Sequence, residues 1–558
     1  MKKFLALCLS AAALATGCVK VDNSLGQGLI DKSLLYDTYT VSFPLTEIQL
    51  RTSEGLSGYS DSHLTIGAIR DEVFGLTTRD AAFTLVPALD EIDLGDNPVA
   101  VSFALYFEED TISCADKSQA NIFQNLYVTE LKERLPQLDT RNTQEIPHGT
   151  EIITDGLPVY NGTGPLAFNF TQKFAQKYVD VIKELGPVLV EHLQDDEDED
   201  GNSMEGIDLY DSYVEKLPGI YIQTDTPNGI GGRINLFKFP CLEVVNSKYT
   251  QNSNLAVLKV NSTWDGEAKD SSFVFVPGEP VFYDEVYFTN NNQKFTQYCF
   301  NRTSQSTQPG PATDKVLVEG GGGLKPVILA SELKEKTSQA IREKGGDPEK
   351  AVIIKGTIVL PYEQPGDYTE MEHFPSILSP TVCVTSTDED SGKEVISFAG
   401  LTDASVSTED QGNIDRSNLM YSPDITYHLQ EILIRGEETS SKADIWLLTI
   451  HTQQVANASS SAYDDDYYRR LMYASYYNSL YGGGYGGYGG YGYGGYGGYG
   501  YSNYYNYMML AQMMAASSQQ TYTTTTELDK DRYYRAVLNG PADERYPFFQ
   551  VTFAIPKE

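Results

Sequence analysis

Short runs of alternating or uniformly apolar residues recur along most of this chain. In residues 101–107, VSFALYF, one face of the run carries Val101, Phe103, Leu105 and Phe107. A period of two is typical of a strand with one buried face, and the other runs are rich in β-branched and aromatic residues. The pattern therefore predicts a mainly β protein. Strands are expected at 38–50, 64–69, 73–78, 101–107, 126–131, 219–224, 233–239, 255–260, 273–276, 281–288, 352–361, 377–386, 443–452, 532–538 and 547–556.

A helical period replaces this alternation between residues 171 and 193. Thr171 is a suitable N-cap, and apolar residues then recur three or four positions apart as far as Leu193. Gly186 and Pro187 lie inside this stretch and are expected to break or kink the helix. The apolar spacing therefore predicts a helix that begins after Thr171.

Two further short helices are predicted, at 332–344 and at 422–434. Ser422 is the expected N-cap of the second one, and Gly436 is its expected stop. Many short strands with few helices favour antiparallel layers, as in a β-sandwich or a jelly roll.

The first eighteen residues have the pattern of a secretory signal. Lys2 and Lys3 precede the apolar run 4–14, and small residues then lead to Cys18. The apolar run is too short to span a bilayer, so it predicts a signal peptide at 1–17. A small residue before Cys18 is the lipobox arrangement of bacterial lipoproteins, which predicts lipidation of Cys18. The alternative is an ordinary signal peptide that happens to contain this cysteine.

The length of 558 residues suggests two to four domains. A lipidated tether is expected at 18–36, followed by an N-terminal β-rich region at 37–250. A C-terminal β-rich region is expected at 251–456 and 527–558. A low-complexity insert at 457–526 interrupts this second region.

The centre of the insert, residues 481–501, contains only 13 Gly and 8 Tyr. Such a stretch cannot offset its ordering entropy with a packed core, so the insert is expected to be disordered. Two interpretations stay open. The insert is either a tolerated expansion of a surface loop or an adhesive loop that contacts a partner through tyrosine.

The chain is strongly acidic, with 77 Asp and Glu against 41 Lys and Arg and a net charge of −36. This balance argues against binding to nucleic acid and against docking on anionic headgroups. No second segment is long and apolar enough to span a membrane, so the lipid is the expected anchor.

Four cysteines are left once Cys8 and Cys18 are set aside, and none forms a C-x-x-C pair. In an oxidising compartment four cysteines allow three pairings. The alternative is that they are small buried hydrophobic residues. The candidates for a disulfide are Cys114, Cys241, Cys299 and Cys383.

An acidic run, DDEDEDGN at 195–202, begins like a calcium-binding loop. The weak candidate ligands are Asp196, Asp198 and Asp200. Ile207 occupies the position where the bidentate glutamate belongs, so a solvated acidic loop is the favoured interpretation and no metal site is predicted.

The remaining motifs predict no catalytic chemistry. The glycine run 320–323 lacks the Lys-Ser/Thr of a P-loop, although Lys325 is close, and a turn between strands fits it better. No histidine pair has metal-ligand spacing, and no G-x-S-x-G motif occurs. No catalytic residue and no cofactor are therefore predicted, although a triad assembled from distant residues is compatible with these absences.

The order of several motifs resembles a known family. TIGAIRDEVFGLTTRDAAF, VSFALYF, LAFNFTQKF, LPGIYIQTD, VEGGGGLKPVIL, VIIKGTIVLPYE and SPDITYHLQEIL follow the lipobox in turn. This order is similar to that of the Bacteroidetes family called domain of unknown function 4270, over the chain from about residue 20 to its end. The resemblance implies a largely β envelope lipoprotein of Bacteroidota without an established activity, and it supplies no catalytic residue.

The expected function is that of a non-enzymatic outer-membrane lipoprotein that binds or scaffolds something at the cell envelope. The expected partners are the membrane, through the lipid, and an envelope protein or a glycan. The alternatives are a glycan-binding surface module and an accessory subunit of an outer-membrane protein assembly. An enzyme ranks after both. The sequence leaves open whether the protein faces the periplasm or the cell surface.

Overall fold

A computed structural model of the chain describes residues 36–557 with several gaps. The signal sequence, Cys18, the acidic run near residue 200 and the Tyr/Gly segment all lie outside the described residues. The gaps within 36–557 are 53–55, 61–62, 88–91, 115, 137–139, 187–211, 239–241, 246–247, 250–254, 279–287, 290–291, 296–298, 388–393, 402, 404–411, 435–442 and 457–521.

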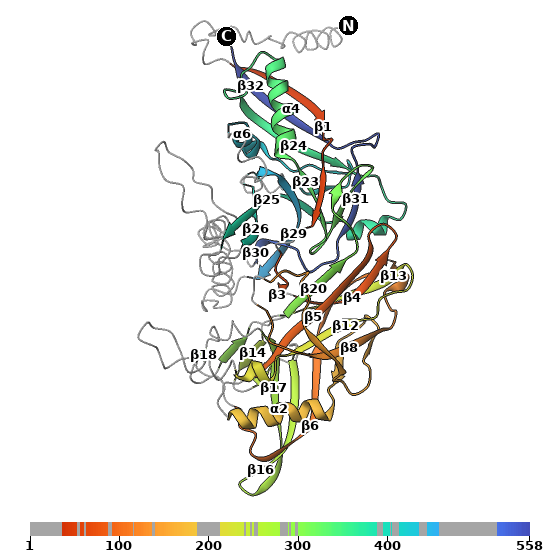
Figure 1. The fold of residues 1–558 in the computed structure, drawn as a ribbon, viewed down its shortest axis with the longest axis vertical. Coiled ribbons are helices and arrows are strands. Elements are labelled where there is room, and N and C mark those ends of the chain that lie inside the picture. Colours follow the sequence, from red (N-terminus) through yellow and green to blue (C-terminus); the bar gives the residue numbers. More distant parts are fainter. Residues whose placement is uncertain are drawn as a thin grey trace, which may run out of the picture.

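Two apolar cores divide the described residues into two lobes, which are stacked along the long axis of the molecule (Figure 1). The sheets of both lobes are antiparallel, and helices are few, which confirms the predicted mainly β class. None of the described helices is both long and apolar enough to span a bilayer.

The first lobe is built on a 14-stranded sheet in which β5 pairs with four other strands. A separate four-stranded sheet lies within the same stretch of sequence. The large sheet comprises β3 (Tyr59–Ser60), β4 (His63–Asp71), β5 (Gly75–Pro87), β6 (Asp96–Phe107), β7 (Glu109–Cys114), β8 (Gln124–Leu131), β9 (His148–Ile152), β10 (Val159–Tyr160), β11 (Leu166–Asn169), β12 (Ile220–Thr224), β13 (Gly231–Lys238), β16 (Leu255–Trp264), β17 (Glu267–Gly278) and β20 (Cys299–Gln305). The small sheet comprises β14 (Leu242–Val245), β15 (Lys248–Tyr249), β18 (Phe288–Thr289) and β19 (Asn292–Phe295).

Helix α2 (Gln172–Leu185) covers part of the large sheet. Thr171 caps it as predicted, because its side chain accepts a hydrogen bond from the backbone N–H of Phe174. Phe174 and Tyr178 then pack against Phe103 of β6, with ring centroids 6.3 and 5.0 Å away. The helix ends at Leu185, and the predicted continuation beyond residue 186 lies outside the described residues.

One detail of β6 differs from its predicted pattern. Phe103, Leu105 and Phe107 are buried as expected, but Val101 is 52% exposed. The pairing with β16 shifts register here: Lys259 pairs with Ser102, and Val260 pairs with Ala100. One extra residue in β6 turns the side chains beyond it to the other face of the sheet. The side chain of Val101 therefore does not share the buried face with Phe103, Leu105 and Phe107.

Within the described residues, the second lobe contains three sheets, two α-helices and the short 3-10 helix η6 (Tyr368–His373). α4 (Ala330–Glu343) and α6 (Thr426–Ile434) pack on the five-stranded sheet. That sheet comprises β1 (Tyr36–Pro44), β32 (Phe548–Pro556), β24 (Val352–Pro361), β28 (Met420–Tyr421) and β27 (Ile414–Asp415). The seven-stranded sheet comprises β21 (Gly310–Pro311), β2 (Gln49–Thr52), β23 (Leu324–Ile328), β29 (Ile445–Ala456), β25 (Ile377–Thr387), β26 (Glu394–Gly400) and β30 (Tyr522–Leu528). The third sheet pairs β22 (Lys315–Glu319) with β31 (Arg535–Asn539).

The start of α6 was predicted wrongly. The helix begins at Thr426, four residues after Ser422, because Pro423 and Asp424 precede it as extended chain. The Asp424 side chain accepts from the backbone N–H of Thr426, and the Asp403 side chain accepts from that of Tyr427. Two carboxylates therefore supply the cap that Ser422 was expected to supply.

The predicted boundary at residues 250 and 251 lies within one sheet. β16 and β17 pair with β6 and β5, so residues 255–278 belong to the first lobe. β1 pairs with β32 and β2 pairs with β23, so residues 36–52 belong to the second lobe. The described chain therefore begins in the second lobe, continues through the first lobe and ends in the second lobe.

The Tyr/Gly insert is placed between the two strands of a hairpin. β29 and β30 pair with each other from Ile450 opposite Leu528 to Ala456 opposite Tyr522. The two ends of the insert therefore lie side by side, as its position between strands predicts. The insert is shorter than predicted at its C-terminal side, since residues 522–526 form part of β30.

Candidate functional site

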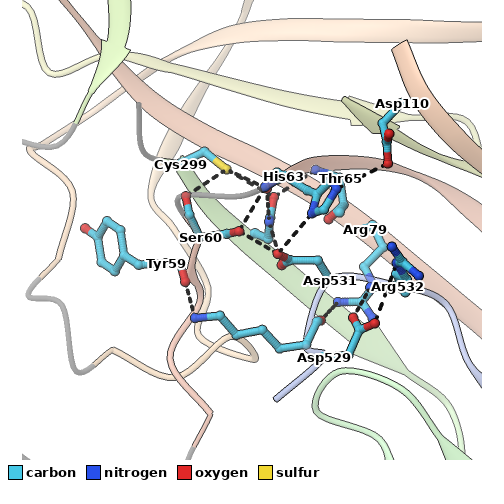
Figure 2. A network of polar contacts seen from close by, with 12 residues as sticks. Tyr59, Ser60, His63, Thr65, Arg79, Asp110, Cys299, Asp529, Asp531 and Arg532 are labelled. Carbon is cyan, nitrogen blue, oxygen red and sulfur yellow. Dashed lines mark hydrogen bonds and ion pairs between the residues drawn. The ribbon is translucent and has the colours of Figure 1, made fainter. Parts of the chain in front are cut away.

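A buried polar network joins the two lobes. After β30 the chain runs through residues 529–534 before it enters β31. Side-chain and backbone groups of this segment contact β3, β4, β5 and β20 of the first lobe (Figure 2). We call this contact region the seam. At the seam, the segment 529–534 of the second lobe contacts strands of the first lobe through charged and polar groups as well as through apolar side chains.

Asp531 is the central acceptor of the seam. Its carboxylate accepts from the Ser60 hydroxyl at 2.5 Å and from the Asn301 side-chain amide at 3.0 Å. The imidazole Nδ1 of His63 lies 3.9 Å away. The carboxylate of Asp531 thus contacts three strands of the first lobe, β3, β4 and β20. Asp531 is 7% exposed.

His63 connects this carboxylate to a second one. Its Nε2 lies 3.2 Å from Oδ2 of Asp110, and Lys238 contacts the other oxygen of Asp110 at 3.2 Å. Burial disfavours the charged imidazole, but the hydrogen bond to Asp110 and the charges of Asp531 and Asp110 outweigh burial and raise the pKa of His63 above 6.5. The hydrogen bond from His63, with help from Lys238, lowers the pKa of Asp110 to about 2.

Cys299 is part of the same network. Its thiol donates to the backbone carbonyl of His63 at 3.3 Å, and the Asn301 side chain donates to the same carbonyl at 2.7 Å. Asn301 also accepts from the backbone N–H of Thr65 at 2.9 Å. In the structure Cys299 is a buried thiol that helps to hold β20 against β4, which corresponds to the second of the two alternatives that the sequence left open for its cysteines.

Arg79 and Lys530 are also part of the seam. Arg79 of β5 is buried, and its guanidinium donates to the Thr303 hydroxyl and to the backbone carbonyl of Lys530. Lys530 in turn donates from its ammonium group to the backbone carbonyls of Tyr59 and Ser57. Burial lowers the pKa of Arg79, and the neighbouring carboxylates act in the opposite direction, Asp531 most strongly.

The geometry of Ser60, His63 and Asp110 differs from that of a hydrolytic triad. In a triad the serine hydroxyl faces the imidazole, and the imidazole faces the carboxylate. Here the Ser60 hydroxyl donates to Asp531, and its oxygen accepts from the backbone N–H of His63 at 3.1 Å. The hydroxyl is therefore directed at an acceptor and not at a base, so the network is suited to holding the lobes together.

The glycine run 320–323 lies at the second-lobe side of the seam. The ammonium group of Lys325 donates to the backbone carbonyls of Glu319, Gly321 and Gly323, and burial lowers its pKa. Carbonyl oxygens thus point at a cation inside the turn, whereas a phosphate site needs N–H groups that point at an anion. The geometry supports the predicted turn. Gly321 has φ +59°, a backbone conformation that favours glycine.

The other predicted residues are dispersed. Cys114 on β7 and Cys383 on β25 are free cysteines of intermediate exposure, so no disulfide joins them. Cys241, Cys18 and the calcium candidates Asp196, Asp198 and Asp200 lie outside the described residues. Within the described part of the chain, no group of three or more His, Cys, Asp and Glu side chains could hold a metal ion.

The seam has no local signature in the sequence, because its members are far apart in the chain. Ser60 and Asp531 are separated by 471 positions, and no spacing rule links them. The sequence feature that marks the seam is the segment 528–535, LDKDRYYR. Its alternating charges stand directly before a strand, where a turn motif would be expected.

Comparison with protein-family models, with curated proteins and with solved structures finds no match for this chain.

Proposed function

We propose that this protein is a lipid-anchored, non-enzymatic component of a bacterial cell envelope, with a binding or scaffolding role. The observation that carries the proposal is the lipobox at Cys18, which lies eighteen residues before β1 begins at Tyr36. An outer-membrane location follows from the resemblance to Bacteroidota lipoproteins. The hydrogen bonds of Ser60 and Asn301 to Asp531 support a structural rather than a catalytic use of these polar groups.

Mass spectrometry of the mature protein tests the anchor. The expected N-terminal residue is an acylated Cys18, and Cys18→Ser is expected to leave an unprocessed precursor without acyl chains. A mature wild-type N-terminus that carries no acyl chain would contradict the proposal. Affinity purification from membranes would then identify co-purifying proteins, with the Cys18→Ser variant as the matched control for contacts that need the anchor.

A glycan-binding role is the second candidate, and one observation favours it. Phe123 and Tyr368 are 78% and 73% exposed, and the segments that carry them are joined between the two lobes by the Lys117–Glu372 ion pair at 2.9 Å. Exposed aromatic faces are suited to stacking on sugar rings.

A glycan array tests this second candidate with Phe123→Ala and Tyr368→Ala. Each substitution is expected to weaken glycan binding by about tenfold, the ratio that ~1.4 kcal/mol produces. Tyr546→Ala, which removes a side chain that is 44% exposed elsewhere, is the control. Absence of any glycan signal for the wild-type protein would exclude this role.

A further inference from the structure

Three exposed apolar side chains gather at one end of the five-stranded sheet. Tyr36, Val352 and Ile354 are 47%, 46% and 51% exposed. Tyr36 is paired with Pro556 of β32, and Val352 is paired with Ala554 of the same strand. Because cross-strand partners point to the same face and alternate residues share it, Tyr36 and Val352 lie on one face. We call Tyr36, Val352 and Ile354 the terminal patch.

The terminal patch lies on the outer face of its sheet. The other face carries Phe553, Ile555 and Ile353, which are buried in the core of the second lobe together with Ile341 of α4. Farther along the outer face the side chains become polar, as in the hydrogen bond between the hydroxyls of Thr40 and Thr552. The apolar character is thus confined to the end of the sheet where β1 starts and β32 finishes, at the top of Figure 1.

The charge around the terminal patch differs from that of the whole chain. Residues 330–361, which contain α4 and β24, carry six Lys and Arg and five Asp and Glu, whereas the chain as a whole has a net charge of −36. Lys355 follows Ile354 directly and is exposed. Lys557 follows Pro556 and pairs with Asp37 at 3.0 Å. This end therefore lacks the acidic excess that would repel a phosphate-bearing surface.

We propose that the terminal patch rests on the lipid surface to which Cys18 is anchored. This inference depends on the proposed lipidation. Seventeen residues, 19–35, connect Cys18 to Tyr36, so even a fully extended tether spans at most about 60 Å. The chain joins the folded body at Tyr36, within the patch itself. Apolar side chains that lie at the boundary between headgroups and acyl chains, with lysines at their rim, then hold the body in one orientation.

The orientation has a consequence for the first lobe. The turn between β16 and β17 lies at the opposite end of the long axis from the start of β1 (Figure 1). With the terminal patch on the lipid, the first lobe extends away from the membrane. Val101 on β6 belongs to this distant lobe and is 52% exposed, nearly the same fraction as Ile354, so it provides a matched reference position.

Quenching by brominated lipid tests the proposal. The lipidated full-length protein is placed in zwitterionic phosphatidylcholine vesicles whose acyl chains carry bromine, and the emission added by a new tryptophan is obtained by subtracting the wild-type signal. Ile354→Trp is expected to lose most of its added emission, and Val101→Trp is expected to keep it. Tyr36→Trp, an aromatic exchange at an exposed position, is the second probe and guards against a folding defect at position 354.

The outcomes separate this inference from the proposed lipidation. Protein that does not float with the vesicles and carries no acyl chain by mass spectrometry would contradict the anchor itself. Acylated protein that floats, but shows no quenching at positions 354 and 36, would overturn the orientation alone. Equal quenching at positions 354 and 101 would overturn it as well, because the body would then have no preferred face toward the lipid.

Discussion

The interiors of the two lobes differ in kind from the seam between them. In the first lobe, Phe103 is surrounded by the rings of Phe170, Phe174, Tyr178 and Phe275, with centroids 4.9 to 6.3 Å away. Such a core is stabilised by burial and tolerates changes of partner as long as volume is kept. Its stability is spread over many small contacts.

At the seam the contacts are few and specific. Asp531 holds Ser60 and Asn301, Lys530 reaches the backbone of Tyr59, and Arg535 pairs with Asp71. An apolar cluster accompanies them, in which Tyr533 packs with Ile69, Ile234 and Leu236. The buried polar groups there share a small set of partners, and the loss of one partner leaves desolvated groups behind. The comparison implies that a core change weakens one lobe, whereas a seam change affects how the lobes are joined.

The largest effect is expected from a core substitution. Phe103→Ala removes a ring that is 0% exposed and should lower the free energy of unfolding by about 4 kcal/mol. Urea denaturation monitored by circular dichroism measures this loss. Val101→Ala, two positions away on the same strand but exposed, should change stability by less than about 0.5 kcal/mol. Similar losses for the two variants would contradict the register shift in β6.

The next effect is expected at the seam. Asp531→Ala leaves the hydroxyl of Ser60 and the amide of Asn301 without their carboxylate acceptor, which should cost about 3 kcal/mol. Asp543→Ala is the control, because its ion pair with Lys315 is partly exposed and worth less than about 1 kcal/mol. Limited proteolysis should show that the Asp531 variant is cleaved between intact lobes. Cleavage within the lobes instead would mean that the network supports a core.

A smaller, pH-dependent effect is expected from His63. Because its folded-state pKa is raised above 6.5, its contribution is fully present below pH 6.5 and is lost as the pH rises through the higher folded-state value. The groups that face it are Asp110, Asp531 and Arg532, and Lys238 acts on it through Asp110. Stability measured in urea should therefore fall between slightly acidic and slightly alkaline pH. His63→Gln should make the free energy of unfolding less dependent on pH. If the variant shows the same pH dependence as the wild type, another group is responsible for it.

The smallest effect is expected from shortening the insert. Deleting residues 481–501 shortens a connection whose ends are already held together by the pairing of β29 with β30. The change in closure entropy is below about 0.6 kcal/mol, the cost of doubling a loop, so the melting temperature should be nearly unchanged. A large loss of thermal stability would show that these tyrosines belong to a core. Weaker recovery of partner proteins at unchanged stability would favour an adhesive loop.

The elements of the fold could largely be predicted, because each is encoded locally. The predicted strand at 352–361 has the bounds of β24, and Thr171 caps α2 as expected. The error at Ser422 is also local in origin. A serine and a carboxylate can both cap a helix, and the sequence does not say that Asp403, from a distant segment, would do so.

The assembly of the elements could not be predicted in the same way. The seam depends on Ser60, His63, Asn301 and Asp531, which carry no common motif and come from segments of both lobes. The membership of β16 and β17 in the first lobe depends on pairing across more than a hundred residues. Long-range pairing of this kind is decided by packing of whole sheets, for which a single sequence holds no local signal.

The pairing of β1 with β32 has a consequence for the order in which the chain folds. Tyr36 lies opposite Pro556, so the first described strand can pair only after the last one has been synthesised. Strands β3 to β20, between residues 59 and 305, have their partners within that span and can assemble earlier. Closing such distant contacts is slow, and an unpaired strand edge is prone to aggregation while it waits. The formation of the second lobe is therefore expected to be the late step of folding, and β1 is expected to stay unpaired until β32 is available.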